Sequence, residues 1–121
     1  MVSERKVEDY LPMSEAMFHV LVSIADGERH GYSIMQEVAA RTEERVQLGT
    51  GTLYGIIKRL LEHGLISEVR RRPAKPEGDR RRRSYTLTPF GREVARAEAD
   101  RLSRMVAAAR SASLITRARS T

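Results

Sequence analysis

The stretch "LGTGTLYGIIKRLLEHGLI", residues 48–66, decides the fold because it carries the clearest helical pattern in the chain. Five apolar side chains in it recur at spacings of three and four residues and so predict one buried helical face: Leu53, Ile56, Ile57, Leu60 and Leu61. Gly64 stands where a left-handed cap commonly ends a helix. The stretch therefore predicts a helix that begins near its first glycines and ends before Gly64.

The glycines at the start of this stretch raise the question of a nucleotide-phosphate loop. Gly49, Gly51 and Gly55 resemble the spacing that lets backbone amides approach a pyrophosphate. However, the preceding residues "RTEERVQ" are too charged for the buried strand of a dinucleotide fold, and Lys58 is not followed by Ser or Thr. We therefore expect Gly49 and Gly51 to let the backbone turn into the helix, and Gly55 to clear its outward face.

The composition bounds the class of protein. The 121 residues fit one small domain, and a net charge of +6 favours a polyanionic partner. The absence of cysteine excludes disulfides and thiolate metal sites, and the three histidines form no i, i+4 pair. We expect no catalytic residues, no metal and no cofactor. The first ten residues lack the apolar core of a signal peptide, and no run is long enough to span a membrane, so we expect a cytoplasmic protein with no membrane partner.

The positive charge is concentrated in one segment, residues 70–83. It holds eight cations against Glu77 and Asp79, so it accounts for the whole net charge of the chain. We expect these eight cations to contact the phosphates of a nucleic acid: Arg70, Arg71, Arg72, Lys75, Arg80, Arg81, Arg82 and Arg83. The alternative is a flexible basic loop that serves solubility or an acidic protein partner.

The remaining pattern predicts short helices, a hairpin and one long helix. Helices are expected over residues 14–25 and 31–42, and strands in "LISEVRR" and "RRSYTLT". Thr88 caps the last helix, which runs to about Ser113. We expect a mainly α fold of the winged helix-turn-helix class. Its parts are an N-terminal arm (1–12), a DNA-binding domain (13–87), a dimerisation helix (88–113) and a basic C-terminal tail (114–121).

The outward face of the third helix suits the major groove of DNA. Its N-terminus offers unpaired amides to a phosphate, and its side chains are hydroxyls, a phenol and cations: Thr50, Thr52, Tyr54, Lys58 and Arg59. A solvated amphipathic helix with incidental charges is the common alternative. The basic hairpin that follows favours the groove, because it would stand beside the helix and reach the next phosphate strand.

The last helix carries a second pattern, a stripe of small and apolar residues spaced alternately by four and three. This spacing is typical of a seam against a partner helix, and its members are Ala95, Ala99, Leu102, Val106 and Ala109. We expect a homodimer formed through this stripe. The alternative is that the helix folds back on its own domain.

Three motifs resemble the PadR-like transcriptional regulators: "ADGERHGYSIMQEV", "LGTGTLYGIIKRLLEHGLI" and "RRRSYTLTPFGREV". The resemblance covers roughly residues 13–114 and implies a homodimeric winged-helix DNA-binding protein, commonly a repressor, that dimerises through the helix after the wing. It further implies that Tyr32, Thr50, Gly51, Thr52, Tyr54 and Lys58 approach DNA. This chain has Thr50 and Gly55 where many relatives have proline. It has no tryptophan, so we do not expect the paired-aromatic ligand site of some short members.

These observations predict a sequence-specific, homodimeric DNA-binding regulator, a repressor that binds a double-stranded operator and is relieved by an effector of unidentified chemistry. The alternative function is a winged-helix module that binds a protein or a small ligand without reading DNA. RNA binding is disfavoured because single-strand readers stack bases on several aromatic rings, and this chain has only four tyrosines and two phenylalanines.

Overall fold

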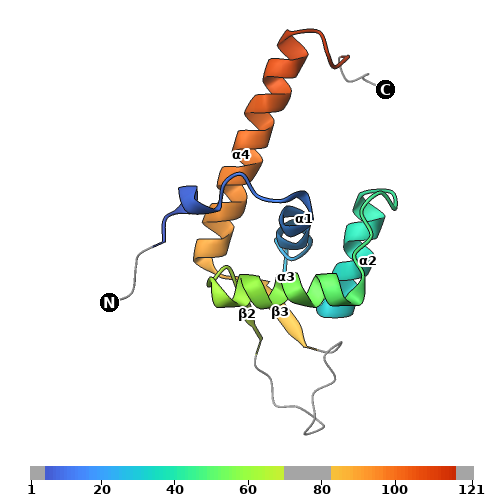
Figure 1. Cartoon of the computed structure of the whole chain (residues 1–121), viewed down its shortest axis with the longest axis vertical. Helices are drawn as coiled ribbons and strands as arrows, with labels where there is room; N and C mark the ends of the chain where they lie inside the picture. Colours follow the sequence, from blue (N-terminus) through green and yellow to red (C-terminus); the bar gives the residue numbers. More distant parts are fainter. Residues whose placement is uncertain (1–4, 70–82, 117–121) are drawn as a thin grey trace, which may run out of the picture.

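A computed structural model of the chain describes residues 5–69 and 83–116. Its helices and strands confirm the expected mainly α architecture with a small sheet and a long C-terminal helix (Figure 1). In chain order the elements are η1 (Val7–Tyr10), α1 (Glu15–Ser23), β1 (Arg29–His30), α2 (Gly31–Arg41), α3 (Thr50–Glu62), β2 (Ile66–Glu68), β3 (Ser84–Leu87) and α4 (Pro89–Ser111).

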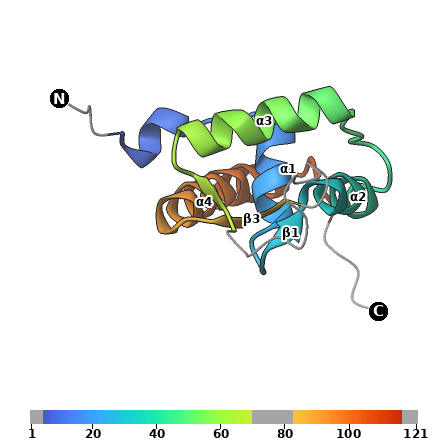
Figure 2. The same cartoon turned by 90° about the horizontal axis from the view of Figure 1, so that it is seen from below.

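Helices α2, α3 and α4 surround α1. Seen from below, α3 lies across one side of the molecule, α1 lies beneath it, and α2 and α4 flank α1 (Figure 2). Leu53, Ile57 and Leu60 of α3 are buried in the common core, and Ile56 packs against its edge. The prediction that Leu61 is buried was wrong: its side chain is 36% exposed. Leu61 lies at the margin of the apolar face, where the sheet does not close over it.

Within the described residues the sheet has three antiparallel strands in the order β1-β3-β2. The expected hairpin is confirmed by the pairing of β2 with β3, in which Ile66 lies opposite Leu87. β1 is not among the strands predicted from the sequence. Arg29 pairs with Tyr85 and His30 with Ser84. A strand of two residues is too short to show the alternation by which strands are found in a sequence.

The predicted helix boundaries hold to within two residues. The Ser14 hydroxyl caps α1 by accepting the amide of Met17 at 3.2 Å, and the Thr88 hydroxyl caps α4 by accepting the amide of Gly91 at 2.9 Å. Gly64 has a φ of 75°, which confirms the left-handed turn after α3. These ends were predictable because each cap is made by residues close in sequence.

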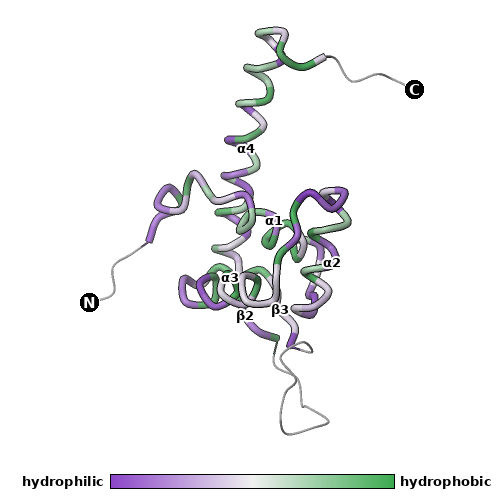
Figure 3. Tube along the Cα trace, turned by 45° about the vertical axis from the view of Figure 1, so that its right-hand side comes forward, coloured by the Kyte–Doolittle hydropathy of each residue, from purple (hydrophilic) through white to green (hydrophobic). Residues whose placement is uncertain are grey.

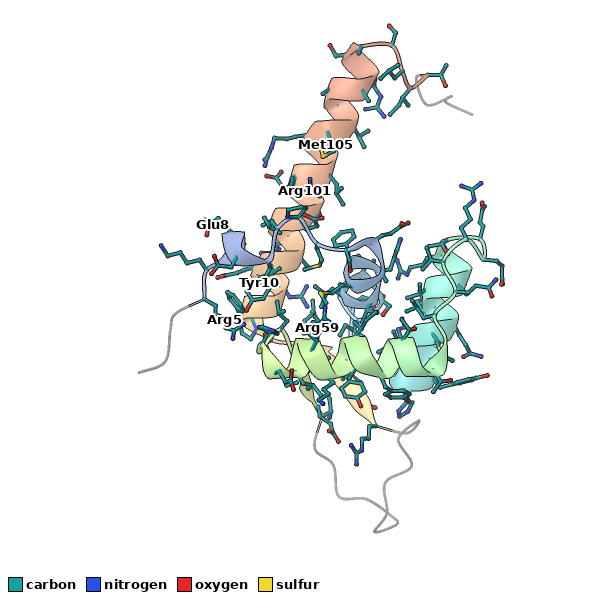
Figure 4. The ribbon with its side chains drawn as sticks, viewed as in Figure 1. Arg5, Glu8, Tyr10, Arg59, Arg101 and Met105 are labelled. Carbon is teal, nitrogen blue, oxygen red and sulfur yellow. The ribbon has the colours of Figure 1, made fainter. Side chains whose placement is uncertain are left out.

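The N-terminal arm packs on the domain from residue 5 onward and runs across α4 (Figures 1 and 4). The Tyr10 ring stands edge-on to Phe90 at 5.7 Å and to His63 at 5.5 Å. Its hydroxyl lies 3.1 Å from Nδ1 of His63, and the Arg5 guanidinium contacts both side chains. The arm therefore joins the end of α3 to the beginning of α4.

A buried carboxylate fastens the end of this arm to α4. Glu98 is only 2% exposed, and it accepts the amide of Met13 at 3.2 Å. Arg101 donates to it twice, from Nε at 2.7 Å and Nη2 at 2.8 Å. The hydrogen bonds from Arg101 lower the pKa of Glu98 against the opposing effect of burial, and the Met13 amide adds to the lowering. Glu98 is thus held ionised where an unpaired charge would be costly.

α4 divides into two halves with different surroundings. In the first half Gly91, Val94 and Glu98 are buried against the domain. The second half projects away from the domain (Figure 1), and Met105 and Val106 are exposed on it by 56% and 42%. Apolar and polar residues alternate along this projecting half (Figure 3). The alternative that the helix folds back on its own domain therefore holds for its first half only.

Candidate nucleic-acid interface

The outward face of α3 is bare at its glycines. A Cβ added to Gly49, Gly51 or Gly55 would meet no atom of the described residues within 4 Å. Gly49 has φ −71° and ψ 164°, which any residue adopts, so the prediction that a tight turn requires glycine there was wrong. Each glycine within a helix costs about 1 kcal/mol relative to alanine. Neither the fold nor the backbone conformation explains Gly51 and Gly55.

The N-terminus of α3 is open to a ligand. Its first residue follows Gly49, which provides no side-chain cap, and the first amides of a helix have no partner within it. Thr50, Gly51 and Thr52 are all exposed here. This end of the helix presents amide hydrogens and a partial positive charge, which together favour an anion.

Tyr54 is less outward than predicted, because it forms part of a junction between α2 and α3. Its side chain is half-buried, and a Cβ on Gly31 would lie 2.6 Å from its hydroxyl oxygen. A side chain at position 31 would therefore have to displace the tip of the Tyr54 ring. The next residue, Tyr32, is 47% exposed at the start of α2. The two tyrosines thus differ, one set against α2 and the other facing solvent.

The strand pairing brings the start of α2 to the hairpin. The amide of Gly31 donates to the carbonyl of Arg83 at 3.1 Å, and the Ser84 hydroxyl hydrogen bonds with Nδ1 of His30 at 2.9 Å. The His-Gly-Tyr, Gly-Thr-Leu-Tyr and hairpin motifs, which are far apart in sequence, consequently meet in one place. No local sequence pattern predicts this junction, because it depends on the pairing of β1 with β3.

A hollow of about 260 Å³ lies between α3 and β3. Two cations and two phenol rings border an apolar floor, and the lining residues are Tyr54, Ile57, Lys58, Leu61, Arg83 and Tyr85. The exposed side of Leu61 forms part of this floor. Lys58 and Arg83, predicted separately as helix and wing cations, therefore face one space.

Arg83 has a carboxylate beside it that sequence reasoning missed. Glu68 of β2 lies 3.7 Å from Nε of Arg83, and both side chains are substantially exposed, by 40% and 47%. Strand register could have suggested the pair, because Glu68 lies opposite Tyr85, two residues from Arg83. The hollow thus has one negative group at its rim.

The other predicted contacts are distributed unevenly. Arg59 is exposed but lies on the side of α3 away from the hairpin (Figure 4), so it does not share the hollow with Lys58. The remaining wing cations lie outside the described residues: Arg70, Arg71, Arg72, Lys75, Arg80, Arg81 and Arg82.

Of the predicted dimer stripe, Ala95 packs against the domain's own core, whereas the rest lies further along α4. Ala99 and Val106 are exposed, and Leu102 and Ala109 are half-buried.

Residues 5–69 and 83–116 contain neither a candidate metal cluster nor a candidate membrane span. No three His, Asp or Glu side chains there are grouped closely enough to hold a metal ion. In the same ranges no helix combines the length and the apolar character needed to cross a bilayer.

Residues 20–97 match the sequence profile described as the Transcriptional regulator PadR-like family. The chain belongs to this family. The family is described as one of transcriptional regulators, and the winged-helix fold agrees with what the resemblance implied.

A curated protein is similar to most of this chain. An uncharacterized 37.1 kDa protein in transposon TN4556 of Streptomyces fradiae is 37% identical over 92 residues, which cover 76% of this chain but only 24% of that protein. The chain therefore spans about a quarter of this curated relative.

Two solved structures share the fold. A transcriptional regulator from Clostridium thermocellum has a TM-score of 0.64 at 20% identity, over 92% of this chain and 97% of its own. Bacillus subtilis PadR in complex with operator DNA has a TM-score of 0.58 at 24% identity, over 75% of this chain and 48% of its own.

Proposed function

We propose that this PadR-like protein is a homodimeric repressor that inserts α3 of each subunit into the major groove of an operator. The hairpin then lies beside the groove and contacts phosphates, and the two copies of α4 hold the reading helices at a fixed distance. The proposal assigns Tyr32, Thr50, Gly51, Thr52 and Tyr54 to groove entry. It assigns Lys58 and Arg59 to phosphates or base edges, and the cations of residues 70–83 to the backbone beside the groove.

The bare glycines of α3 carry the proposal. Gly51 and Gly55 stand one helical turn apart on an exposed face, they cost helix stability, and nothing within the described chain occupies the space above them. A surface kept free of side chains lets another polymer approach the helix backbone closely. The B-DNA major groove, about 12 Å wide, admits one helix and leaves little room beyond it.

The charges beside these glycines favour DNA over a neutral partner. The open amides at the N-terminus of α3 can bind a phosphate, and Lys58 and Arg83 flank the hollow on the hairpin side. The same fold in Bacillus subtilis PadR is seen in complex with operator DNA. Because phosphate neutralisation releases counterions, binding should weaken steeply with salt.

The projecting half of α4 supports the dimer. Met105 and Val106 expose apolar surface there, and Ala99 and Ala109 continue the small-residue stripe toward a second helix. A twofold axis through this half would place two copies of α3 on successive major grooves, about 34 Å apart. Such a dimer would bind a palindromic operator in the cytoplasm and be released from it by an effector.

A pair of small-to-large substitutions tests the groove assignment. Gly55→Leu adds bulk where space is open, so the fold should persist, but the helix should be held away from the groove. We expect at least tenfold weaker binding to a selected operator in gel-shift titrations at two salt concentrations. Ala40→Leu, at an exposed position near the end of α2, provides the matched control and should bind as wild type.

Equal affinities for the two variants would contradict the groove assignment. No discrete complex with wild-type protein at micromolar concentration would contradict the function itself and favour a module that binds a protein or ligand.

A further inference from the structure

We propose that the hollow between α3 and β3 seats one phosphate of the DNA backbone, and that Glu68 is the counter-ion which this phosphate displaces from Arg83. The inference rests on the proposed function and deepens it. It assigns Glu68, a residue outside the predicted interface, the role of limiting the affinity for DNA of any sequence.

The lining of the hollow matches a phosphodiester. Lys58 on α3 and Arg83 before β3 supply two cations from two different elements, so an anion between them would bridge the recognition helix and the hairpin. Guanidinium groups bind phosphate through paired, charge-assisted hydrogen bonds. The apolar floor formed by Ile57 and Leu61 offers no hydrogen-bonding side chain but suits the carbon atoms of a deoxyribose.

The contact between Glu68 and Arg83 is weak enough to be exchanged. The Nε and Oε2 atoms are 3.7 Å apart, which is too long for a hydrogen bond, and both side chains are well exposed to water. Exposed ion pairs of this kind contribute little to stability, because solvent screens the charges and two long side chains must be ordered. A phosphate that also contacts Lys58 can therefore outcompete the carboxylate.

The exchange has a cost that falls on every DNA sequence. When Arg83 turns to a phosphate, the Glu68 carboxylate is left next to a second negative charge. The Glu68 carboxylate must then recruit a cation from solution. This uptake cancels part of the counterion release that drives DNA binding. Since phosphates carry no sequence information, this cost lowers non-specific binding as much as specific binding. The affinity then depends more strongly on contacts of α3 with base edges.

The test compares two substitutions that change the net charge equally. Glu68→Gln removes the competitor, and Glu8→Gln removes an exposed carboxylate on the N-terminal arm, away from the hairpin (Figure 4). Fluorescence anisotropy of full-length protein would be measured on a selected operator and a scrambled duplex across a salt series. We expect Glu68→Gln to bind both duplexes about threefold to tenfold more tightly than Glu8→Gln. Its salt slope should be steeper by up to about 0.9.

A third substitution checks that Glu68 acts through Arg83. In an Arg83→Gln background, the increase in DNA affinity caused by Glu68→Gln should be no larger than the increase caused by Glu8→Gln. Inorganic phosphate, added at constant ionic strength, should not compete with DNA beyond the effect of salt. If inorganic phosphate inhibited DNA binding by the wild type but not by Lys58→Gln, the hollow would hold free phosphate. That result would overturn the assignment of the hollow to a phosphate of the DNA backbone.

The outcomes separate the two proposals. A wild-type complex with equal affinities for Glu68→Gln and Glu8→Gln overturns this inference and leaves the DNA-binding function intact. The absence of any wild-type complex overturns the proposed function and the inference with it.

Discussion

Replacing Gly91 with alanine should destabilise the protein strongly, although alanine is the better helix former. Gly91 lies in the first turn of α4, where the helix crosses the start of β2. A Cβ there would lie 1.8 Å from the carbonyl oxygen of Leu65 and 2.7 Å from its carbonyl carbon. Both neighbours are backbone atoms, so no side-chain rotation can relieve the collision. The helix and the strand must move apart by about 1 Å or more.

That movement would strain a junction held by short hydrogen bonds. The amide of Thr88 donates to the carbonyl of Leu65 at 3.1 Å, and the Thr88 hydroxyl donates to the carbonyl of Gly64 at 2.6 Å. Overpacking typically costs about 1–3 kcal/mol, a lost hydrogen bond adds about 1, and helix propensity returns about 1. The net loss is about 1–3 kcal/mol, equivalent to a fall in Tm of roughly 4–18 °C for a domain of this size.

Thermal unfolding followed by circular dichroism measures the effect, with Gly55→Ala as the control. Gly55 is also in a helix, but a Cβ there meets open space. Gly55→Ala should therefore raise the free energy of unfolding by up to about 1 kcal/mol. If Gly91→Ala melted within about 3 °C of wild type, or if both variants shifted Tm alike, the packing of α4 on β2 would be described wrongly.

Two further predictions concern α4. Because its pKa is lowered in the folded state, ionised Glu98 stabilises the protein at neutral pH, and this stability is lost as the pH falls through the lowered value. Glu98→Gln should lower the free energy of unfolding by about 1–3 kcal/mol at pH 7. In urea titrations the deficit should shrink below about pH 4, whereas exposed Glu93→Gln should show little deficit at either pH; a deficit independent of pH would contradict the role of the charge. Val106→Asp should weaken the dimer at least tenfold in sedimentation equilibrium, because it buries an unpaired carboxylate. Ala108→Asp lies on a different side of the helix and should leave dimer affinity unchanged. Equal effects of the two substitutions would refute the assignment of the stripe to the dimer interface.

The elements that the sequence predicted well are those determined by nearby residues. The apolar spacing of α3 and the caps at Ser14 and Thr88 involve positions at most eight residues apart, and they were located correctly. Leu61 shows the limit of this reasoning, since periodicity defines a face but not how far the neighbouring sheet extends over it. Burial at the edge of a face depends on tertiary packing.

Contacts between distant segments could not be predicted. The pairing of β1 with β3, the packing of Tyr10 on His63 and Phe90, and the bond from Met13 to Glu98 each join residues more than 50 positions apart. No local pattern marks either partner. No pattern in the sequence around Glu98 distinguishes it from an exposed helix residue, although it is among the most buried side chains of α4.

Only part of the candidate interface could be predicted, because the rest depends on contacts between distant segments. The exposed residues of α3 follow from helical geometry alone, whereas the position of Tyr54 depends on Gly31. The shared hollow of Lys58 and Arg83, and the presence of Glu68 beside it, depend on how the hairpin packs against α3.

The central claim is that two copies of α3 read one palindromic operator, and selection from a random duplex library followed by footprinting tests it most directly. We predict that the selected sites contain an inverted repeat whose half-sites lie one helical turn apart, about 10 base pairs between centres. Both half-sites should be protected together, and protection should weaken steeply as salt rises. Failure to enrich any sequence, or protection of a single unpaired half-site by a monomer, would contradict the account.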